Sequence, residues 1–251
     1  MWRGAGGVRQ ILHRERVQSL AWPRSYLPVP WYNQEDAQNE GCREMTAAEI
    51  LQLNGDMRDS PLMEVVRRFH ALCSSRELPY CVIGGMAVIR NGYARTTMDV
   101  DILTFKKDWG MLLPLQGEIS SNGPESCVDI KTGVTIDILF ADDDWQMPMG
   151  MPDPRKVGEY DQELGACFIG LHALVQLKTA VYLSKLREQG EDVASKDRSD
   201  VYELISRNLA KFSKEVIQTY DPAVKKHCVM AFETAVRASK SKKRVRRDIG
   251  P

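Results

Sequence analysis

Hydrophobic residues recur along the middle of the chain with two periods, one typical of helices and the other of strands. Over residues 61–72 they follow helical spacing, which predicts an amphipathic helix. Residues 80–83, 100–103 and 134–140 are short runs rich in β-branched and aromatic residues, and in the last of these apolar and polar positions alternate. These three runs predict strands.

Glycine and proline mark the ends of further elements. Gly84-Gly85 is expected to end the strand at 80–83 and to open a helical turn at 86–90, and Thr132-Gly133 is expected to be the turn of a hairpin. The remaining predicted elements are a helix at 106–116, a strand at 128–130, a long helix at 164–186, a charged loop at 187–196, and helices at 200–209 and 223–236. The expected fold is therefore α+β, with a small mixed sheet flanked by helices and a helical C-terminal half.

The predicted strands place a core domain with the sheet at 45–145, and the predicted helices after it place a helical region at 146–238. Both ends of the chain differ in composition from these two regions. Residues 1–44 are rich in arginine, and the first thirty contain only one acid, Glu15, which leaves open a transit peptide, a disordered arm, or an extension before a true start at Met45. The fold is expected to begin near Thr46, which forms a capping-box pattern with Glu49. Residues 239–251 form a basic tail, and a solvated terminus is a commoner explanation for it than a nucleic-acid-binding segment.

Composition narrows the class of protein. Hydrophobic residues make up 43% and charged residues 27%, and Lys plus Arg equals Asp plus Glu at 34 each. These values are typical of a globular protein, and the balanced charge favours no particular partner. The six cysteines form no C-x-x-C pair, so we expect free thiols in a reducing cytoplasm rather than a zinc site. No apolar run is long enough to span a bilayer, so no membrane partner is expected.

Candidate chemistry is concentrated in three acids. Asp99 and Asp101 alternate with apolar neighbours, so they point to the same face of a predicted strand. Asp137 lies on the polar face of the strand at 134–140, and it joins the other two if these strands are neighbours. Three carboxylates on a rigid sheet are suitable ligands for Mg²⁺ or Mn²⁺. The alternatives are a chance D-x-D and an ion pair of Asp137 with a cation such as Lys131, and Asp129 is the next candidate for the third acid.

Residues that suit a triphosphate surround these acids. Gly84 and Gly85 come between a strand and a helix, where backbone N–H groups can approach a phosphate, although a tight turn explains them equally well. Arg95 and Thr97 lie just before Asp99, where a guanidinium and a hydroxyl can steer phosphates or simply fix the loop.

The stretch C-V-I-G-G-M-A-V-I-R-N-G-Y-A-R-T-T-M-D-V-D-I-L, residues 81–103, closely resembles the core motif of the DNA polymerase beta-like nucleotidyltransferase superfamily. It is most similar to the stand-alone AbiEii and minimal-nucleotidyltransferase type, many of which occur in toxin–antitoxin pairs. T-I-D-I-L around Asp137 resembles the family's third acid, and Lys178 in L-V-Q-L-K-T-A and K-D-R-S-D-V at 196–201 are similar to elements of its helical half. Many members have Ser where this chain has Gly85.

The resemblance implies an enzyme of EC 2.7.7 type that transfers a nucleoside monophosphate from an NTP, such as ATP, to an acceptor hydroxyl. Asp99 and Asp101 would ligate Mg²⁺ or Mn²⁺, Asp137 would complete the site and help to deprotonate the acceptor, and Gly84-Gly85 and Lys178 would hold phosphates. The acceptor would be tRNA or another RNA, a protein or a small molecule, and a cognate toxin or antitoxin would be a partner. A catalytically silent antitoxin or regulator and a nucleic-acid-binding module are the alternatives.

Lys178 lies close to the apolar face of the long predicted helix, four residues after Leu174 and three after Val175. A lysine at such a position either extends its amine to solvent or points at an anion. If it holds a phosphate, replacing it by Met is expected to lower nucleotide affinity and to leave stability unchanged or raised, because an unpaired cation near the core is removed; unchanged affinity would mean that the lysine only extends to solvent.

Overall fold

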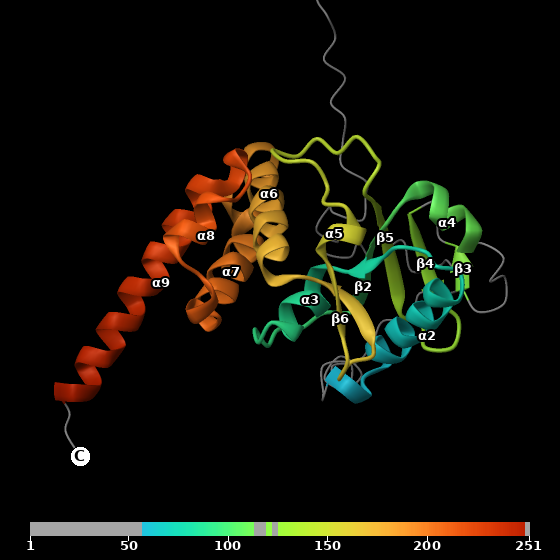
Figure 1. The fold of residues 1–251 in the computed structure, drawn as a ribbon, viewed down its shortest axis with the longest axis horizontal. Helices are drawn as coiled ribbons and strands as arrows, with labels where there is room; N and C mark the ends of the chain where they lie inside the picture. The colour runs from blue at the N-terminus through green and yellow to red at the C-terminus, as the bar shows by residue number, and fades with distance from the viewer. Residues whose placement is uncertain (1–56, 113–118, 122–124, 249–251) are drawn as a thin grey trace, which may run out of the picture. The chain divides into compact units, whose positions relative to one another are not determined.

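The computed structural model describes residues 57–112, 119–121 and 125–248 (Figure 1). The predicted N-terminal segment 1–44 and the capping box of Thr46 and Glu49 lie outside the described residues. The predicted helix at 106–116 is described as α-helix over Lys106–Leu112, and its last four residues lie outside the described residues.

One mixed sheet of seven described strands, in the order β3-β4-β5-β2-β1-β7-β6, is the centre of the fold. Its strands are β1 (Cys81–Val82), β2 (Asp99–Thr104), β3 (Ile119–Ser121), β4 (Ser126–Asp129), β5 (Thr135–Phe140), β6 (Gly158–Asp161) and β7 (Ala166–Ile169). The pairs β2–β5 and β1–β7 are parallel, and the other pairs are antiparallel. The predicted α+β class with a mixed sheet is therefore confirmed.

Helices flank this sheet, and the described residues that follow β7 along the chain are mostly helical. They are α2 (Pro61–Ser75), α3 (Gly84–Arg90), α4 (Lys106–Leu112), α5 (Pro154–Val157), α6 (Leu171–Gln189), α7 (Glu191–Arg207), α8 (Lys214–Gln218) and α9 (Pro222–Asp248), with 3-10 turns η3 (Met57–Asp59) and η4 (Leu209–Lys211). α6, α7 and α9 pack on one another, and α9 continues beyond that contact as a single helix (Figure 1). The predicted helical C-terminal half is therefore present.

Local sequence explains where α2 begins. Ser60 accepts a hydrogen bond from the backbone N–H of Met63 at 3.2 Å, and Pro61 occupies the first turn, where its missing N–H costs nothing. Most apolar positions of α2 are buried, as the helical spacing predicts, and Leu72 is half-buried.

Two predicted elements in the second half are wrong. The long helix begins at Leu171 rather than at 164, because residues 166–169 form β7 and Gly165, at φ +70°, closes the hairpin with β6. The charged stretch at 187–196 is not a loop, since Gly190, at φ +89°, ends α6 and α7 begins at once at Glu191.

The sheet extends beyond residue 145, where the predicted core ends. β7 lies parallel to β1 with Phe168 opposite Val82, and β6 pairs with β7 at the sheet edge. The five described cysteines are all free thiols. No helix in the described part of the chain combines the length and apolarity that crossing a membrane requires.

Candidate active site

The three predicted acids meet on one face of the sheet. β2 and β5 pair in parallel with Asp101 directly opposite Asp137, and Asp99 lies two residues before Asp101 on the same face. One carboxylate oxygen from each of the three lies within 4.8 Å of the others. Among residues 57–112, 119–121 and 125–248, this is the one group of three or more acidic, histidine or cysteine side chains close enough to share a metal ion.

Hydroxyl groups orient two of these carboxylates. Thr97 Oγ1 donates to Oδ1 of Asp99 at 2.8 Å, and Ser126 Oγ donates to Oδ1 of Asp137 at 2.9 Å. Thr97 was a predicted site residue, whereas Ser126 was not predicted. Ser126 reaches the site because β4 pairs with β5 in a register that places Ser126 opposite Asp137.

The acids disfavour each other's ionisation. Burial raises the pKa of Asp101 well above its ordinary value, the charge of Asp99 raises it further, and Lys178 opposes the change. Burial also raises the pKa of Asp137, although the hydrogen bond from Ser126 acts against it. Negative groups held this close, on a rigid sheet and with oxygen donors only, fit a hard divalent cation such as Mg²⁺.

Gly84 and Gly85 lie against these side chains. Gly84 has φ +60°, and a Cβ atom there would lie 1.7 Å from Oδ2 of Asp101. A Cβ atom at position 85 would lie 2.2 Å from Oγ1 of Thr97 and 2.9 Å from Nη2 of Arg95. The two glycines therefore make room for Asp101, Thr97 and Arg95, and these neighbours explain why Gly rather than Ser occupies position 85.

Arg95 connects this region to the helical half of the chain. Its side chain is only 11% exposed, and Nε lies 3.4 Å from Oδ1 of Asp200 on α7. The guanidinium lies next to Gly85, and its role in steering phosphates stays a prediction, because a carboxylate of the chain itself lies beside Nε.

Lys178 does not extend to solvent. Its Nζ lies 3.0 Å from Oδ1 of Asp197 and 3.0 Å from Oδ2 of Asp200, and both carboxylates are buried. Asp197 also binds Lys185, at 2.7 Å. The premise that Lys178 is an unpaired cation is therefore wrong, and with it the expectation that Lys178→Met leaves stability unchanged or raised. The sequence contained these partners in the K-D-R-S-D-V element but no sign of which cation they bind.

The pKa values of this cluster reflect its ion pairs. Burial alone would lower the pKa of Lys178, but the nearby carboxylates of Asp197 and Asp200 raise it above its ordinary value. Burial also opposes ionisation of Asp197, yet Lys178 and Lys185 lower the pKa of Asp197 to about 2. Lys178 and Asp197 are therefore ionised at neutral pH.

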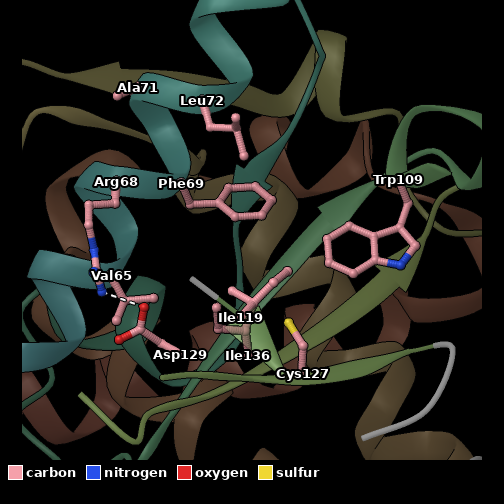
Figure 2. A pocket seen from close by; sticks show the side chains of 10 residues that line it. All are labelled: Val65, Arg68, Phe69, Ala71, Leu72, Trp109, Ile119, Cys127, Asp129 and Ile136. Atoms are coloured by element: carbon pink, nitrogen blue, oxygen red, sulfur yellow. Dashed lines mark hydrogen bonds and ion pairs between the residues drawn. The ribbon is translucent and has the colours of Figure 1, made fainter. Parts of the chain in front are cut away.

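Asp129, the next candidate for the third acid, lies on the opposite face of the sheet. It forms an ion pair with Arg68 of α2, shown by the dashed line in Figure 2, and it accepts hydrogen bonds from the backbone N–H and the hydroxyl of Thr132. Both charged residues line a cavity of about 330 Å³ whose other walls are largely apolar, among them Phe69 and Ile136 (Figure 2). Asp129 therefore cannot replace Asp137 without a change in strand register.

A second hollow, of about 560 Å³, lies along α6, α7 and α9. Tyr93, Tyr182 and Tyr202 line it, together with polar side chains such as Arg198 and His227. None of the three site acids belongs to its walls.

No family model and no curated protein matches the chain. Among solved structures, an antigenic nucleotidyltransferase-like protein from Paracoccidioides brasiliensis is similar with a TM-score of 0.46 and 16% identity, over 72% of this chain and 88% of that one. A protein from Thermotoga maritima whose structure is described as that of a putative nucleotidyltransferase has a TM-score of 0.39 and 16% identity, over 53% of this chain and 90% of that one. ANT(2")-Ia in complex with adenylyl-2"-tobramycin has a TM-score of 0.38 and 14% identity, over 72% and 98%. The solved structures that the chain is similar to thus include nucleotidyltransferase-like proteins, each at low sequence identity.

Proposed function

We propose that this chain is a Mg²⁺-dependent nucleotidyltransferase, which transfers a nucleoside monophosphate from an NTP to an acceptor hydroxyl. The observation that carries the proposal is the register of β2 and β5, which places Asp101 opposite Asp137 with Asp99 on the same face. Three half-buried carboxylates would be costly in such an arrangement unless a cation neutralised them.

Asp99, Asp101 and Asp137 would hold Mg²⁺ or Mn²⁺, and the bound metal would neutralise charge on the triphosphate and on the acceptor oxygen. Ser126 occupies Oδ1 of Asp137, so Oδ2 of that carboxylate is the atom that accepts the proton of the acceptor hydroxyl. The acceptor oxygen forms a bond to the α-phosphorus, the bond from this phosphorus to the bridging oxygen breaks, and pyrophosphate leaves.

Positioning groups for the nucleotide lie beside the acids. Gly84 and Gly85 lie at the start of α3, the first against Asp101 and the second against Thr97 and Arg95. Lys178 contributes a positive charge close enough to lower the pKa of Asp101. In a reaction that depends on orientation and charge neutralisation, these are the groups that would hold phosphates.

The likeness of residues 81–103 to the AbiEii and minimal-nucleotidyltransferase motif supports a finer proposal. The acceptor would be an RNA such as tRNA, a protein or a small molecule, and the chain would act with a cognate toxin or antitoxin in the cytoplasm. The balanced charge of the chain favours none of these acceptors over another.

Incubation of the full chain with each of four NTPs, labelled at the α-phosphate, and a cell lysate tests the proposal. We expect label to be transferred from at least one NTP by the wild type and not by an Asp99→Asn/Asp101→Asn variant. Asp144→Asn is the matched control, because Asp144 is an exposed acid outside the cluster. Equal transfer by the double variant would place the chemistry elsewhere. Mn²⁺ binding without any transfer would instead favour a catalytically silent module.

A further inference from the structure

Three charged residues of α7, Lys196, Asp197 and Asp200, lie within two turns of one another next to the cations Arg95 and Lys178. Asp197 and Asp200 are buried, and they bind Lys178 of α6 and Arg95, which precedes β2. Lys196 is four residues before Asp200, so the two share a helical face one turn apart. This position places the lysine at the edge of the charged cluster, where its side chain remains exposed.

The other cations of the cluster are already paired within the chain. Arg95 lies 3.4 Å from Asp200, Lys178 lies 3.0 Å from each of two carboxylates, and Lys185 lies 2.7 Å from Asp197. Their side chains are at most 16% exposed. A ligand that entered here would meet charges that are largely neutralised by buried carboxylates.

Lys196 differs from these cations in its partners. Among the described residues, none forms a hydrogen bond or ion pair with Lys196. Partial burial lowers its pKa, and the like charges of Arg95 and Lys178 lower it further, while Asp99 attracts it. The side chain is therefore a cation next to the acid cluster whose hydrogen-bonding capacity is unused, and an anion from outside the chain would satisfy it.

We propose that Lys196 binds the terminal phosphates of the nucleotide, and so selects triphosphates over monophosphates. This inference rests on the proposed function and refines it, because it moves the contact with the terminal phosphates from Lys178 to Lys196 and leaves Lys178 as the cation of α6 that binds Asp197 and Asp200 of α7. A flexible lysine suits this task, since its three N–H donors can follow a phosphate group as it leaves.

Binding of inorganic tripolyphosphate in Mg²⁺, measured by titration calorimetry, tests the assignment without knowledge of the preferred base. Lys196→Met is expected to weaken tripolyphosphate binding by about 10- to 100-fold, the worth of a charge-assisted hydrogen bond. Lys196→Arg is expected to retain most of the affinity, and AMP binding is expected to change little in either variant. Lys226→Met, at an exposed lysine on α9, is the control.

The outcomes separate this inference from the proposed function. If the wild type binds tripolyphosphate and Lys196→Met binds it equally well, the lysine assignment is overturned and the nucleotidyltransferase proposal stands. If the wild type binds neither tripolyphosphate nor any NTP, both are overturned. The urea midpoint of Lys196→Met is expected to equal or exceed that of the wild type, because no described partner loses a contact. A lower midpoint together with unchanged affinity would assign the lysine to the fold.

Discussion

Lys178→Met is the substitution whose expected effect the structure changes most. The sequence alone suggested that losing this charge would be harmless to the fold. In the structure, the ammonium lies 3.0 Å from two carboxylates, each with no more than 3% of its side chain exposed. Methionine keeps most of the stem volume, so the variant removes the charge with little change in packing.

The size of the effect follows from what remains after the substitution. Removing one partner of a buried ion pair typically costs about 3–5 kcal/mol, because the other charge is left uncompensated. Here Asp197 keeps Lys185 at 2.7 Å, and Asp200 keeps Arg95 at 3.4 Å. We therefore expect the lower end, about 3 kcal/mol. With a urea m-value of about 2 kcal/mol/M, the unfolding midpoint should fall by about 1.5 M.

Urea unfolding followed by circular dichroism measures this shift, and two further lysines calibrate it. Lys185→Met removes one ion pair rather than two and should lower the midpoint less. Lys226→Met, at an exposed residue, should leave it unchanged. A midpoint for Lys178→Met within about 0.3 M of the wild type, at an unchanged m-value, would refute the view that this lysine neutralises buried carboxylates.

Three other substitutions test the site and the cluster beside it. Ser126→Ala should weaken Mn²⁺ binding several-fold in calorimetry, because the third acid loses its orienting hydrogen bond, and Ser126→Thr should restore it; equal affinity in all three proteins would contradict the role. Gly84→Ala should lower the melting temperature much more than Gly133→Ala. Both residues have positive φ (+60° and +70°), but a Cβ would meet a neighbouring carboxylate only at position 84. Asp197 has its pKa lowered to about 2, so its contribution of about 2 kcal/mol is complete above its ordinary pKa of 3.8 and is lost as pH falls through 2. In Asp197→Asn, the fall of the urea midpoint at acidic pH should be smaller than in the wild type. An unchanged pH dependence of the midpoint would count against the ion pairs.

The strands that carry the acids could be predicted because their pattern is local. In β2 and β5 apolar residues alternate with acids, and the side-chain period of a strand fixes which residues share a face. β6 escaped prediction because it is an edge strand of four residues, with Glu159 and Tyr160 pointing to solvent. β7 was assigned to the following helix because its apolar run continues into α6 without a break in hydrophobicity, and only Gly165 and Gly170 mark its ends.

The acids of the site could likewise be predicted, whereas their partners could not. Asp99, Asp101 and Asp137 depend on one strand pairing, which the hydrophobic pattern favours. The hydrogen bond from Ser126 to Asp137 depends on the register of one more strand pair. The contact of Arg95 with Asp200 depends on how α7 packs, and α7 lies about one hundred residues after the loop that contains Arg95. Tertiary packing determines such contacts, and spacing in the sequence carries no signal for them.

The ion pairs around Lys178 are better explained as a means of fixing the orientation of α7 than as a means of stabilising the fold. A buried ion-pair network is often no more stabilising than apolar residues of the same volume, because desolvation offsets the attraction between the charges. Two carboxylates of α7 nonetheless bind Lys178 and Lys185 of α6, and one of them also binds Arg95, which precedes β2. Ion pairs require specific distances and directions, so they fix the rotation of α7 about its axis more closely than apolar contacts would. With that rotation fixed, the phosphate contact that we propose for Lys196 is fixed as well, and a change that loosens the network should reduce tripolyphosphate binding even where the fold survives.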